Sequence, residues 1–205
     1  MGDNMKQLAM KAKLSTIPKR EVILPSGYKF INFDGSEALK NAWKQIVMEP
    51  PVPPFSADEY WKLAIEDYLD IDLVPEKDIF FIENDKNQIV ATITTITHAN
   101  GTGYLHMVKM LMSERGKGLG QAMSDFSIEE FRKRGVEDVY LTTDDFRVPA
   151  VKTYLKSGYL PIIYTDPESD MTARWEALFE QIKYQKTQYV YEEFREYREI
   201  IDEKN

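Results

Sequence analysis

Short apolar runs alternate with amphipathic stretches along most of the chain. Runs rich in β-branched and aromatic residues, each short enough for one strand, occupy 22–33, 79–83, 88–97, 104–112, 136–143 and 159–164. Apolar residues recur at three- and four-residue spacing over 39–47, 61–69, 121–134 and 149–157, which predicts helices. The predicted order is strand, two helices, three strands, helix, strand, helix, strand. This alternation is typical of a mixed α/β (α+β) domain.

The two ends of the chain lie outside this alternation. Residues 1–20 are polar and basic, with Pro18 near their end, and they predict a leader or a short added helix without chemistry of its own. Helical spacing resumes over 170–204 and predicts a long C-terminal helix rich in tyrosine. We therefore expect an N-terminal leader over 1–20, a domain over 21–168 and a C-terminal helical extension over 169–205. The extension either packs on its own domain or pairs with a second copy as a homodimer, and the sequence leaves both open.

Capping residues and prolines mark the ends of the first two predicted helices. Asp34 and Glu37 have the spacing of a capping pair before the first helix, and Ser56 and Glu59 have it before the second. The proline-rich segment 50–54 lies between them and ends the first helix, because proline cannot continue one.

A basic, glycine-rich turn connects the strand over 104–112 to the helix over 121–134. It reads Arg115-Gly116-Lys117-Gly118-Leu119-Gly120. The start of a helix leaves backbone N–H groups unpaired and carries about half a positive charge, so it suits an anion. Glycines let the backbone approach a phosphate closely, and two cationic side chains add full charges. The turn therefore predicts a pyrophosphate-binding site.

The spacing within the turn separates it from other phosphate-binding turns. It lacks the glycine spacing of a dinucleotide fingerprint and the Gly-Lys-Ser/Thr end of a P-loop. Arg115, Gly118 and Gly120 instead fit the pattern of Arg or Gln, two residues, Gly, one residue, and Gly or Ala. At these residues the sequence resembles the GNAT superfamily of acyl-CoA-dependent N-acetyltransferases. For this hexapeptide alone, a turn that binds nothing is the alternative.

A second block of residues strengthens the resemblance. Ala150, Tyr154 and Gly158 have the family's Ala-x-x-x-Tyr-x-x-x-Gly spacing, and the aromatic Tyr159 follows them. The element order over 21–165 also resembles the family's topology. The resemblance implies a GNAT fold, with a mixed, mostly antiparallel β-sheet flanked by helices and here an extra C-terminal helix. It also implies acetyl-CoA (coenzyme A) as a co-substrate.

The resemblance assigns a set of residues to coenzyme A. In the family, the strand before the turn contacts the pantetheine through backbone groups, and the turn binds the pyrophosphate. The implied cofactor-binding residues are Val108, Lys109, Met110, Arg115, Gly116, Lys117, Gly118, Leu119, Gly120 and Gln121. The backbone N–H of Met110 stands at the position that would stabilise an oxyanion. Arg147 replaces the usual Asn of the second block, and it could contact a coenzyme A phosphate or pair with Asp144 or Asp145.

Acetyl transfer to an amine needs a proton acceptor for the amine and a proton donor for the departing thiolate. The resemblance implies that Tyr154 is the donor, and a tyrosine that only fills the core is the alternative. His106 is a candidate acceptor. It lies four residues before Met110, so strand alternation predicts that both side chains share one face. Its position resembles one of two histidines that arylalkylamine acetyltransferases use, and Tyr104 stands at the place of the other.

Other assignments of the proton acceptor stay open. A lone histidine on an apolar strand is as commonly a core residue, hydrogen-bonded within the protein, as a catalytic one. Thr142 stands where ribosomal-protein acetyltransferases have a glutamate, and it cannot act as a base. Asp144, two residues on, could reach the amine through water, and Glu83 is a more remote choice.

Composition narrows the range of partners. The 205 residues carry a net charge of −8, which argues against nucleic acid as the main partner. The chain has no cysteine and two histidines, so disulfides, thiolate ligands and a zinc site are not expected. No apolar run reaches the length of a membrane span, and residues 1–20 lack the apolar core of a signal peptide. We expect a cytoplasmic protein without a metal and without a membrane partner.

These features favour an acetyl-CoA-dependent N-acetyltransferase that acetylates a primary amine of a small molecule or peptide by direct attack. Tyr154 would be the general acid, and His106, Asp144 or a water chain would take the amine proton. The alternative is a catalytically silent acyl-CoA-binding module that acts as a sensor or scaffold. The sequence does not specify the amine, because loops and helices around the acceptor site select it.

Overall fold

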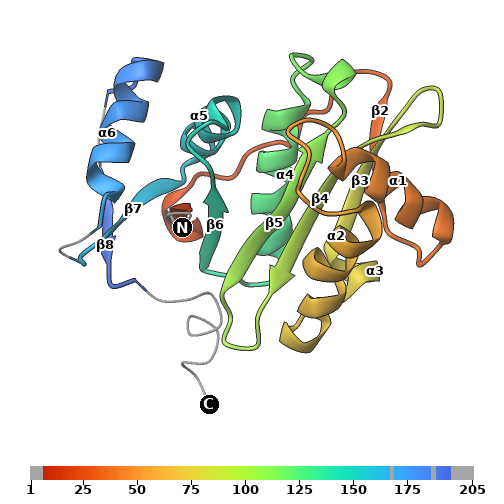
Figure 1. Cartoon of the computed structure of the whole chain (residues 1–205), viewed down its shortest axis with the longest axis horizontal. Coiled ribbons are helices and arrows are strands. Elements are labelled where there is room, and N and C mark those ends of the chain that lie inside the picture. Colours follow the sequence, from red (N-terminus) through yellow and green to blue (C-terminus); the bar gives the residue numbers. More distant parts are fainter. Residues whose placement is uncertain (1–6, 167–168, 186–187, 195–205) are drawn as a thin grey trace.

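The computed structural model describes residues 7–166, 169–185 and 188–194. In these ranges an eight-stranded sheet carries six α-helices on its two faces (Figure 1). The strands are β1 Leu8–Lys13, β2 Tyr28–Asn32, β3 Ile79–Asn84, β4 Ile89–Thr97, β5 Gly103–Met110, β6 Asp138–Thr143, β7 Leu160–Tyr164 and β8 Val190–Glu192. The α-helices are α1 Glu37–Val47, α2 Ala57–Ala64, α3 Pro75–Asp78, α4 Leu119–Lys133, α5 Val148–Ser157 and α6 Met171–Ile182. Short 3₁₀ helices occupy Leu14–Thr16, Glu66–Ile71 and Met112–Glu114.

The sheet is mixed and mostly antiparallel. Its strands follow the order β2-β3-β4-β5-β6-β1-β7-β8. Among the described strands, only the β5–β6 and β7–β8 pairs are parallel. The mostly antiparallel sheet with flanking helices that the resemblance implied is confirmed.

Apolar side chains form two cores, one on each face of the sheet. The larger core lies under α4, α5 and α6 and includes Phe131 and Trp175. The second core lies under α1 and α2 and includes Trp43 and Trp61. In Figure 1, α1 and α2 lie in front of the sheet and α4 lies behind it. The apolar stripes of these helices, spaced at three and four residues, account for the faces they bury.

The starts of α1 and α2 differ in how well they were predicted. Ser56 and Glu59 form the predicted capping box before α2, each satisfying a backbone N–H of the other. Ser36, not Asp34, caps α1, and its side chain accepts a hydrogen bond from the Leu39 N–H at 3.3 Å. Asp34 instead accepts from the Ser36 N–H at 2.9 Å, which fixes the turn before the cap.

Residues 8–13, which the sequence assigns to the leader, form a strand inside the sheet. β1 lies between β6 and β7 and pairs antiparallel with both. Leu8, Met10 and Ala12 alternate along it, are at most 1% exposed and face the larger core. Burial of these apolar side chains stabilises the strand, although the residues around it in the sequence are polar and basic. The next segment crosses the helical face, where Arg132 donates to the carbonyls of Leu14 and Ile17 at 3.0 Å.

The predicted C-terminal helix is shorter than the sequence suggests. α6 ends at Ile182, and Lys183 takes a left-handed φ of 52°, which stops the helix. β8 follows and pairs parallel with residues 162–164 of β7. Residues 195–204, the last part of the predicted helix, lie outside the described residues.

β5 and β6 separate soon after they meet. Their parallel pairing covers only Gly103 with Val139 and Tyr104 with Tyr140. β5 meanwhile stays paired with β4 as far as Met110. Beyond Tyr104, the two parallel strands diverge and leave a gap between them. Strand divergence of this kind exposes the backbone of β5 on the side that faces β6.

Candidate functional site

A β-bulge in β5 sets the direction of the side chains along the gap. Two residues, Met107 and Val108, face the single residue Ile93 of β4, and Met107 has a left-handed φ of 47°. The bulge shifts the alternation by one residue. His106 therefore points toward α2, whereas Met110 packs against the larger core on the other face. The prediction that these two side chains share a face is wrong, because it assumed a regular strand.

The backbone N–H of Met110 points into the gap. Met110 is paired with Ala91 of β4, and the N–H of the next residue, Leu111, donates to the Val90 carbonyl at 2.9 Å. This pattern belongs to a non-hydrogen-bonded pair, in which the backbone groups of the paired residue point away from the neighbouring strand. The N–H of Met110 therefore faces the side from which β6 has separated. A backbone donor in this orientation suits an oxyanion.

The glycine-rich turn lies at the open end of the gap. A Cβ placed on Gly120 would lie 3.7 Å from the methyl group of Met110 and 3.8 Å from Thr153 Oγ1 of α5. Gly116 and Gly118 have φ values of 80° and 87°, which glycine adopts without strain. α4 starts directly after Gly118, and the first N–H groups of a helix have no partner within it. The turn therefore presents backbone donors between β5 and α5.

Both cationic side chains of the turn have protein partners. Arg115 Nη2 donates to the Pro50 carbonyl at 2.9 Å. Lys117 Nζ lies 3.0 Å from Glu114 Oε2, and the same oxygen accepts a hydrogen bond of 2.6 Å from the Tyr28 hydroxyl. The bonds from Tyr28 and Lys117 lower the pKa of Glu114, so this carboxylate is ionised and offsets part of the positive charge of the turn.

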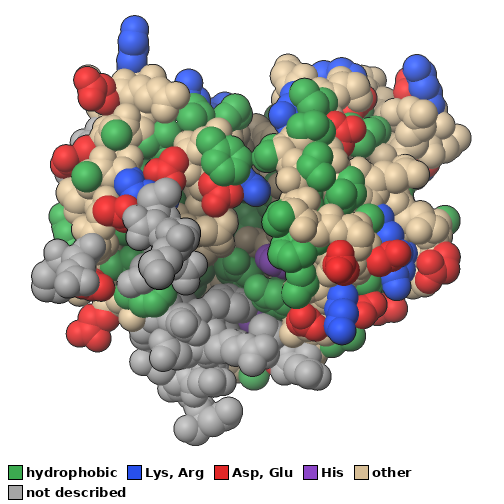
Figure 2. Space-filling model, viewed as in Figure 1, with side chains coloured by type: hydrophobic (Ala, Val, Ile, Leu, Met, Phe, Trp, Pro, Cys, Tyr) green, Lys and Arg blue, Asp and Glu red, His purple; other side chains and the backbone are tan. Residues whose placement is uncertain are grey.

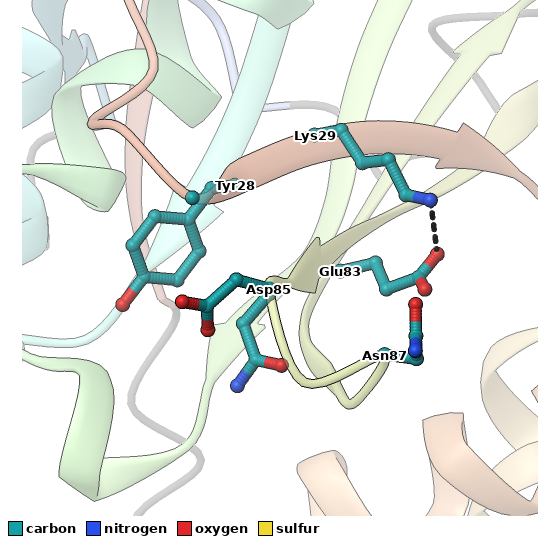
Figure 3. A pocket seen from close by; sticks show the side chains of 7 residues that line it. Tyr28, Lys29, Glu83, Asp85 and Asn87 are labelled. Carbon is teal, nitrogen blue, oxygen red and sulfur yellow. Dashed lines mark ion pairs between the residues drawn. The ribbon is translucent and has the colours of Figure 1, made fainter.

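Tyr28 also borders a shallow pocket at the β2 edge of the sheet (Figure 3). The pocket has a volume of about 250 Å³ and is lined by Gly27, Tyr28, Lys29, Glu83, Asn84, Asp85 and Asn87. Lys29 Nζ and Glu83 Oε2 form an ion pair of 3.2 Å, which is the dashed line in Figure 3. Glu83 is thus held at this edge, with β4 between its strand and β5.

Tyr154 lies on α5, next to Thr153 and so beside the turn. Its side chain is 8% exposed, and its ring packs edge-on against Tyr159 with centroids 5.8 Å apart. Burial raises the pKa of Tyr154 to about 12, against a smaller opposing effect of the Arg147 charge. Among the hydrogen bonds of the described residues, none involves the Tyr154 hydroxyl. The hydroxyl therefore keeps its proton at neutral pH and has donor capacity to spare.

Two residues at the start of α4 turn their side chains away from the turn. Gln121 Nε2 donates to Asp125 Oδ1 at 3.0 Å and to Ser157 Oγ at 2.8 Å, which ties α4 to α5. Leu119 is 1% exposed and belongs to the larger core. A ligand at the turn would meet these residues through their backbone groups.

Asp144 is held by ion pairing and hydrogen bonding. Arg147 Nε lies 2.8 Å from Asp144 Oδ2, and Gln7 Nε2 donates to Oδ1 at 2.9 Å. Asp145 pairs with Arg174 instead, with Nε 3.0 Å from Oδ1. Of the contacts that the sequence left open for Arg147, the structure shows the pair with Asp144.

His106 is hydrogen-bonded to the end of α2. Its Nε2 lies 2.9 Å from the Ala64 carbonyl, and because a carbonyl only accepts, Nε2 carries the proton. The ring lies against Tyr68 and Tyr104, with centroids 4.6 Å and 5.4 Å away. Burial lowers the pKa of His106 to about 4, although the Ala64 carbonyl opposes the shift. The imidazole is therefore neutral at pH 7.

Lys109 faces the proline-rich loop. Its Nζ donates to the carbonyl of Val47 and, at 3.2 Å, to that of Pro51. Burial lowers the pKa of Lys109 to about 8, and the nearby charges of Arg147 and Arg115 add to this shift. Val108, by contrast, packs against the larger core on the opposite face of the sheet.

A hollow separates the part of the molecule that carries α1 and α2 from the part that carries α5 and α6 (Figure 2). Hydrophobic side chains border it in this view. Tyr60 of α2 reaches toward β5, where its hydroxyl lies 3.7 Å from Met107 Sδ. Burial raises the pKa of Tyr60, and the charges of Arg147 and Asp144 also act on it. The neutral Tyr60 thus lies near the ion pair of Arg147 and Asp144 at this face.

Two features of this region were not predicted from the sequence. The first is the ion pair between Glu114 and Lys117. Glu114 directly precedes the cationic turn, so its position in the sequence already indicates a pair with Lys117 or Arg115. The second is the set of hydrogen bonds from Lys109 and Arg115 to residues 47–51. The acceptors are backbone carbonyls, which every residue has, so the sequence does not indicate these bonds.

Within the described ranges, no helix is long and apolar enough to cross a bilayer. The same part of the chain holds no group of three or more histidine or acidic side chains arranged to bind a metal ion.

The acetyltransferase (GNAT) family model matches residues 40–159, more than half of the chain. The chain belongs to this family. In this GNAT-family protein the matched region starts in α1 and ends just after α5, so it includes the diverging strands, the glycine-rich turn and Tyr154.

Two mycothiol acetyltransferases are similar in sequence to this GNAT-family protein. The enzyme of Beutenbergia cavernae is 23% identical over 145 residues, which cover 68% of this chain and 47% of the relative. That of Thermomonospora curvata is 22% identical over 169 residues, which cover 78% of this chain and 54% of the relative. The chain thus spans about half the length of the curated relatives it matches.

Solved structures show the same fold. A GCN5-related N-acetyltransferase from Sphaerobacter thermophilus aligns with a TM-score of 0.61 at 21% identity, over 75% of this chain and 47% of that one. The ribosomal-protein-S18-alanine N-acetyltransferase from Escherichia coli aligns with a TM-score of 0.51 at 17% identity, over 64% of this chain and 76% of that one. At these identities the likeness shows the fold alone.

Proposed function

We propose that this GNAT-family protein transfers an acetyl group from acetyl-CoA to a primary amine of a small molecule or peptide. The observation that carries the proposal is the divergence of β5 from β6 directly beside the Gly118 turn. What supports the proposal is the proximity of three groups, namely a backbone N–H of β5, the donors at the start of α4, and α5, which carries Tyr154.

The residues of the turn fit the pyrophosphate of acetyl-CoA. Gly118 lies at the N-terminus of α4 with a φ of 87°, and the nearest atom that a Cβ there would meet is 3.8 Å away. The backbone can therefore approach an anion closely while the helix N-terminus attracts it. Arg115 keeps donors beyond the one it gives to Pro50. Bound there, acetyl-CoA supplies the activated acetyl group as a thioester.

The attacking amine must be neutral. An alkyl amine with a pKa near 10.4 is mostly protonated at pH 7, a handicap of about 4 to 5 kcal/mol. Direct proton transfer to His106, with a pKa of about 4, would be uphill by about 9 kcal/mol from such an amine. Asp144 is held by Arg147 and Gln7. We therefore assign the removal of the amine proton to a water chain.

Two groups serve the acyl-transfer step itself. The Met110 N–H stabilises the oxyanion that forms when the amine attacks the acetyl carbonyl. Tyr154, protonated because burial raises its pKa to about 12, donates to the sulfur of the departing thiolate. The C–S bond breaks, the sulfur leaves with a proton, and the amide product carries the acetyl group.

The test is thiol release from acetyl-CoA across a panel of small amines, amino sugars and peptide N-termini, with mass spectrometry of the products. Release that depends on one amine class and yields its N-acetyl product supports the proposal. Saturable binding of acetyl-CoA without release for any amine would favour the silent acyl-CoA-binding module. Failure to bind acetyl-CoA would contradict both functions.

A further inference from the structure

Two side chains of β5 bind the last carbonyls of the two helices that cover it. His106 Nε2 lies 2.9 Å from the carbonyl of Ala64, the last residue of α2. Lys109 Nζ donates to the carbonyl of Val47, the last residue of α1, and also contacts Pro51 at 3.2 Å. The strand beside the gap is thereby joined to both helices.

These two carbonyls would otherwise need water, because the final carbonyls of a helix have no partner within it. The chain that follows each helix bonds elsewhere. The Glu49 N–H donates to the Ile46 carbonyl at 3.2 Å, and the Tyr68 N–H donates to the Ile65 carbonyl at 3.1 Å. The side chains from β5 supply the donors for the Val47 and Ala64 carbonyls, so the end of each helix is fixed to the strand.

The bulge makes both contacts possible. Residues 106 and 109 are three apart, and in a regular strand their side chains would point to opposite faces. The extra residue at Met107 puts both side chains on the same face of the sheet, so the imidazole and the ammonium group each reach the side that carries the helices. The left-handed φ of Met107 is strained because this residue is not glycine, and the attachment of α1 and α2 to β5 depends on it.

The loop between α1 and α2 receives two more contacts from the same strand and turn. Arg115 Nη2 donates to the Pro50 carbonyl at 2.9 Å. The Met112 N–H donates to the Glu49 carboxylate at 3.2 Å. Residues 47–51 are therefore held by the part of the chain that, under the proposed function, binds the acyl donor.

We propose that α1, α2 and their loop, which border the hollow in Figure 2, form the wall of the acceptor site, and that His106 and Lys109 are positioning residues that fix this wall to the strand that binds the acyl donor. This inference rests on the proposed function and deepens it. Neither side chain exchanges a proton with the amine, and neither touches acetyl-CoA. Their effect is on where the amine is held relative to the thioester, and small displacements of a nucleophile cost large factors in rate.

Four variants test the proposal by steady-state kinetics and acetyl-CoA titration. His106→Leu and Lys109→Met remove the donors, whereas His106→Gln and Lys109→Arg keep a donor of similar reach. We expect the first pair to lower kcat/KM for the amine at least about tenfold, with acetyl-CoA affinity changed less than about threefold. The conservative pair should recover most of the loss.

The pH–rate profile separates a positioning role from a base. If His106 only positions α2, the acid limb of kcat/KM keeps its apparent pKa in His106→Gln and His106→Leu. Loss of that limb in both variants would overturn the proposal by making His106 the base. A change in acetyl-CoA affinity with an unchanged kcat/KM for the amine would overturn it for Lys109.

Amide hydrogen exchange tests the attachment even without turnover. His106→Leu should speed exchange near the end of α2, and Lys109→Met should do so near the end of α1, each relative to its conservative partner. Unchanged exchange at both helix ends would overturn the inference. Faster exchange in a protein that acetylates no amine would instead refute the proposed function and leave the attachment standing.

Discussion

The hydroxyl of Tyr104 lies 3.1 Å from Thr142 Oγ1, and this contact bridges β5 and β6 after their backbones have stopped pairing. The last backbone pair joins Tyr104 to Tyr140, so the hydroxyl reaches two residues farther along β6. Tyr104 is 7% exposed, and burial raises its pKa, which keeps the hydroxyl protonated. On the face that carries α1 and α2, this hydrogen bond therefore joins the two strands beyond their last backbone pair.

A double-mutant cycle measures this bridge. Tyr104→Phe and Thr142→Val each remove one hydroxyl, and we expect a coupling free energy of about 0.5 to 1.5 kcal/mol in urea unfolding. The double variant should therefore lose less stability than the sum of the single variants. Strictly additive losses would show that the two hydroxyls do not interact in solution.

Removal of the Tyr154 hydroxyl tests the general acid. Tyr154→Phe should lower kcat about 100-fold, because the departing thiolate loses its donor, while acetyl-CoA affinity changes little. Tyr159→Phe is the matched control, since its ring lies 5.8 Å from that of Tyr154 and its side chain is fully buried. Similar kcat values for Tyr154→Phe and the parent protein would remove Tyr154 from the reaction.

The pKa of His106 predicts a pH dependence of stability. The folded protein has a His106 pKa of about 4, against about 6.5 for an unfolded histidine, and the rings of Tyr68 and Tyr104 lie against the imidazole. Between these values the unfolded chain binds more protons, so this group's contribution is lost as the pH falls. From pH 7 to pH 4.5, the parent should lose about 2 to 3 kcal/mol more than His106→Gln in urea unfolding. Equal losses would contradict the neutral, buried imidazole.

A buried ion pair joins the end of α4 to α3. Arg134 Nη1 lies 2.7 Å from Asp78 Oδ1, and the two side chains are 12% and 3% exposed. Arg134→Met should cost about 3 to 5 kcal/mol in unfolding free energy, because it leaves a carboxylate buried without its partner. The neighbouring Lys133→Met should cost less than about 1 kcal/mol, since its side chain is 69% exposed. A comparable loss in both variants would show that burial of the pair is not the source of stability.

Local sequence patterns predicted the parts of the site that depend on neighbouring residues. The turn from Arg115 to Gly120 and the start of α4 follow from glycines that adopt a left-handed φ and from the apolar stripe behind them. Ser56 and Glu59 likewise cap α2 as predicted. In each case the residues that decide the conformation lie within a few positions of one another.

Contacts between distant residues were not predicted. Residues 8–13 alternate like a strand, but their partners in β6 begin 130 residues later, and nothing local indicates that pairing. The bulge at Met107 had no signal either, because methionine is not a residue that favours a left-handed φ. That one extra residue put His106 and Met110 on opposite faces and placed Lys109 beside the loop between α1 and α2.

The most direct measurement is the affinity of acetyl-CoA for the parent protein and for two glycine variants, determined by calorimetry. Gly118→Glu puts a bulky anion in the turn, whereas Gly101→Glu makes the same change at a φ of 84°, matched to 87° at Gly118, in the distant turn between β4 and β5. We predict that the parent binds acetyl-CoA, that Gly118→Glu loses at least about 100-fold in affinity, and that Gly101→Glu stays within about threefold. Equal affinity in all three proteins, or no binding by the parent, would contradict a pyrophosphate site at residues 115–120.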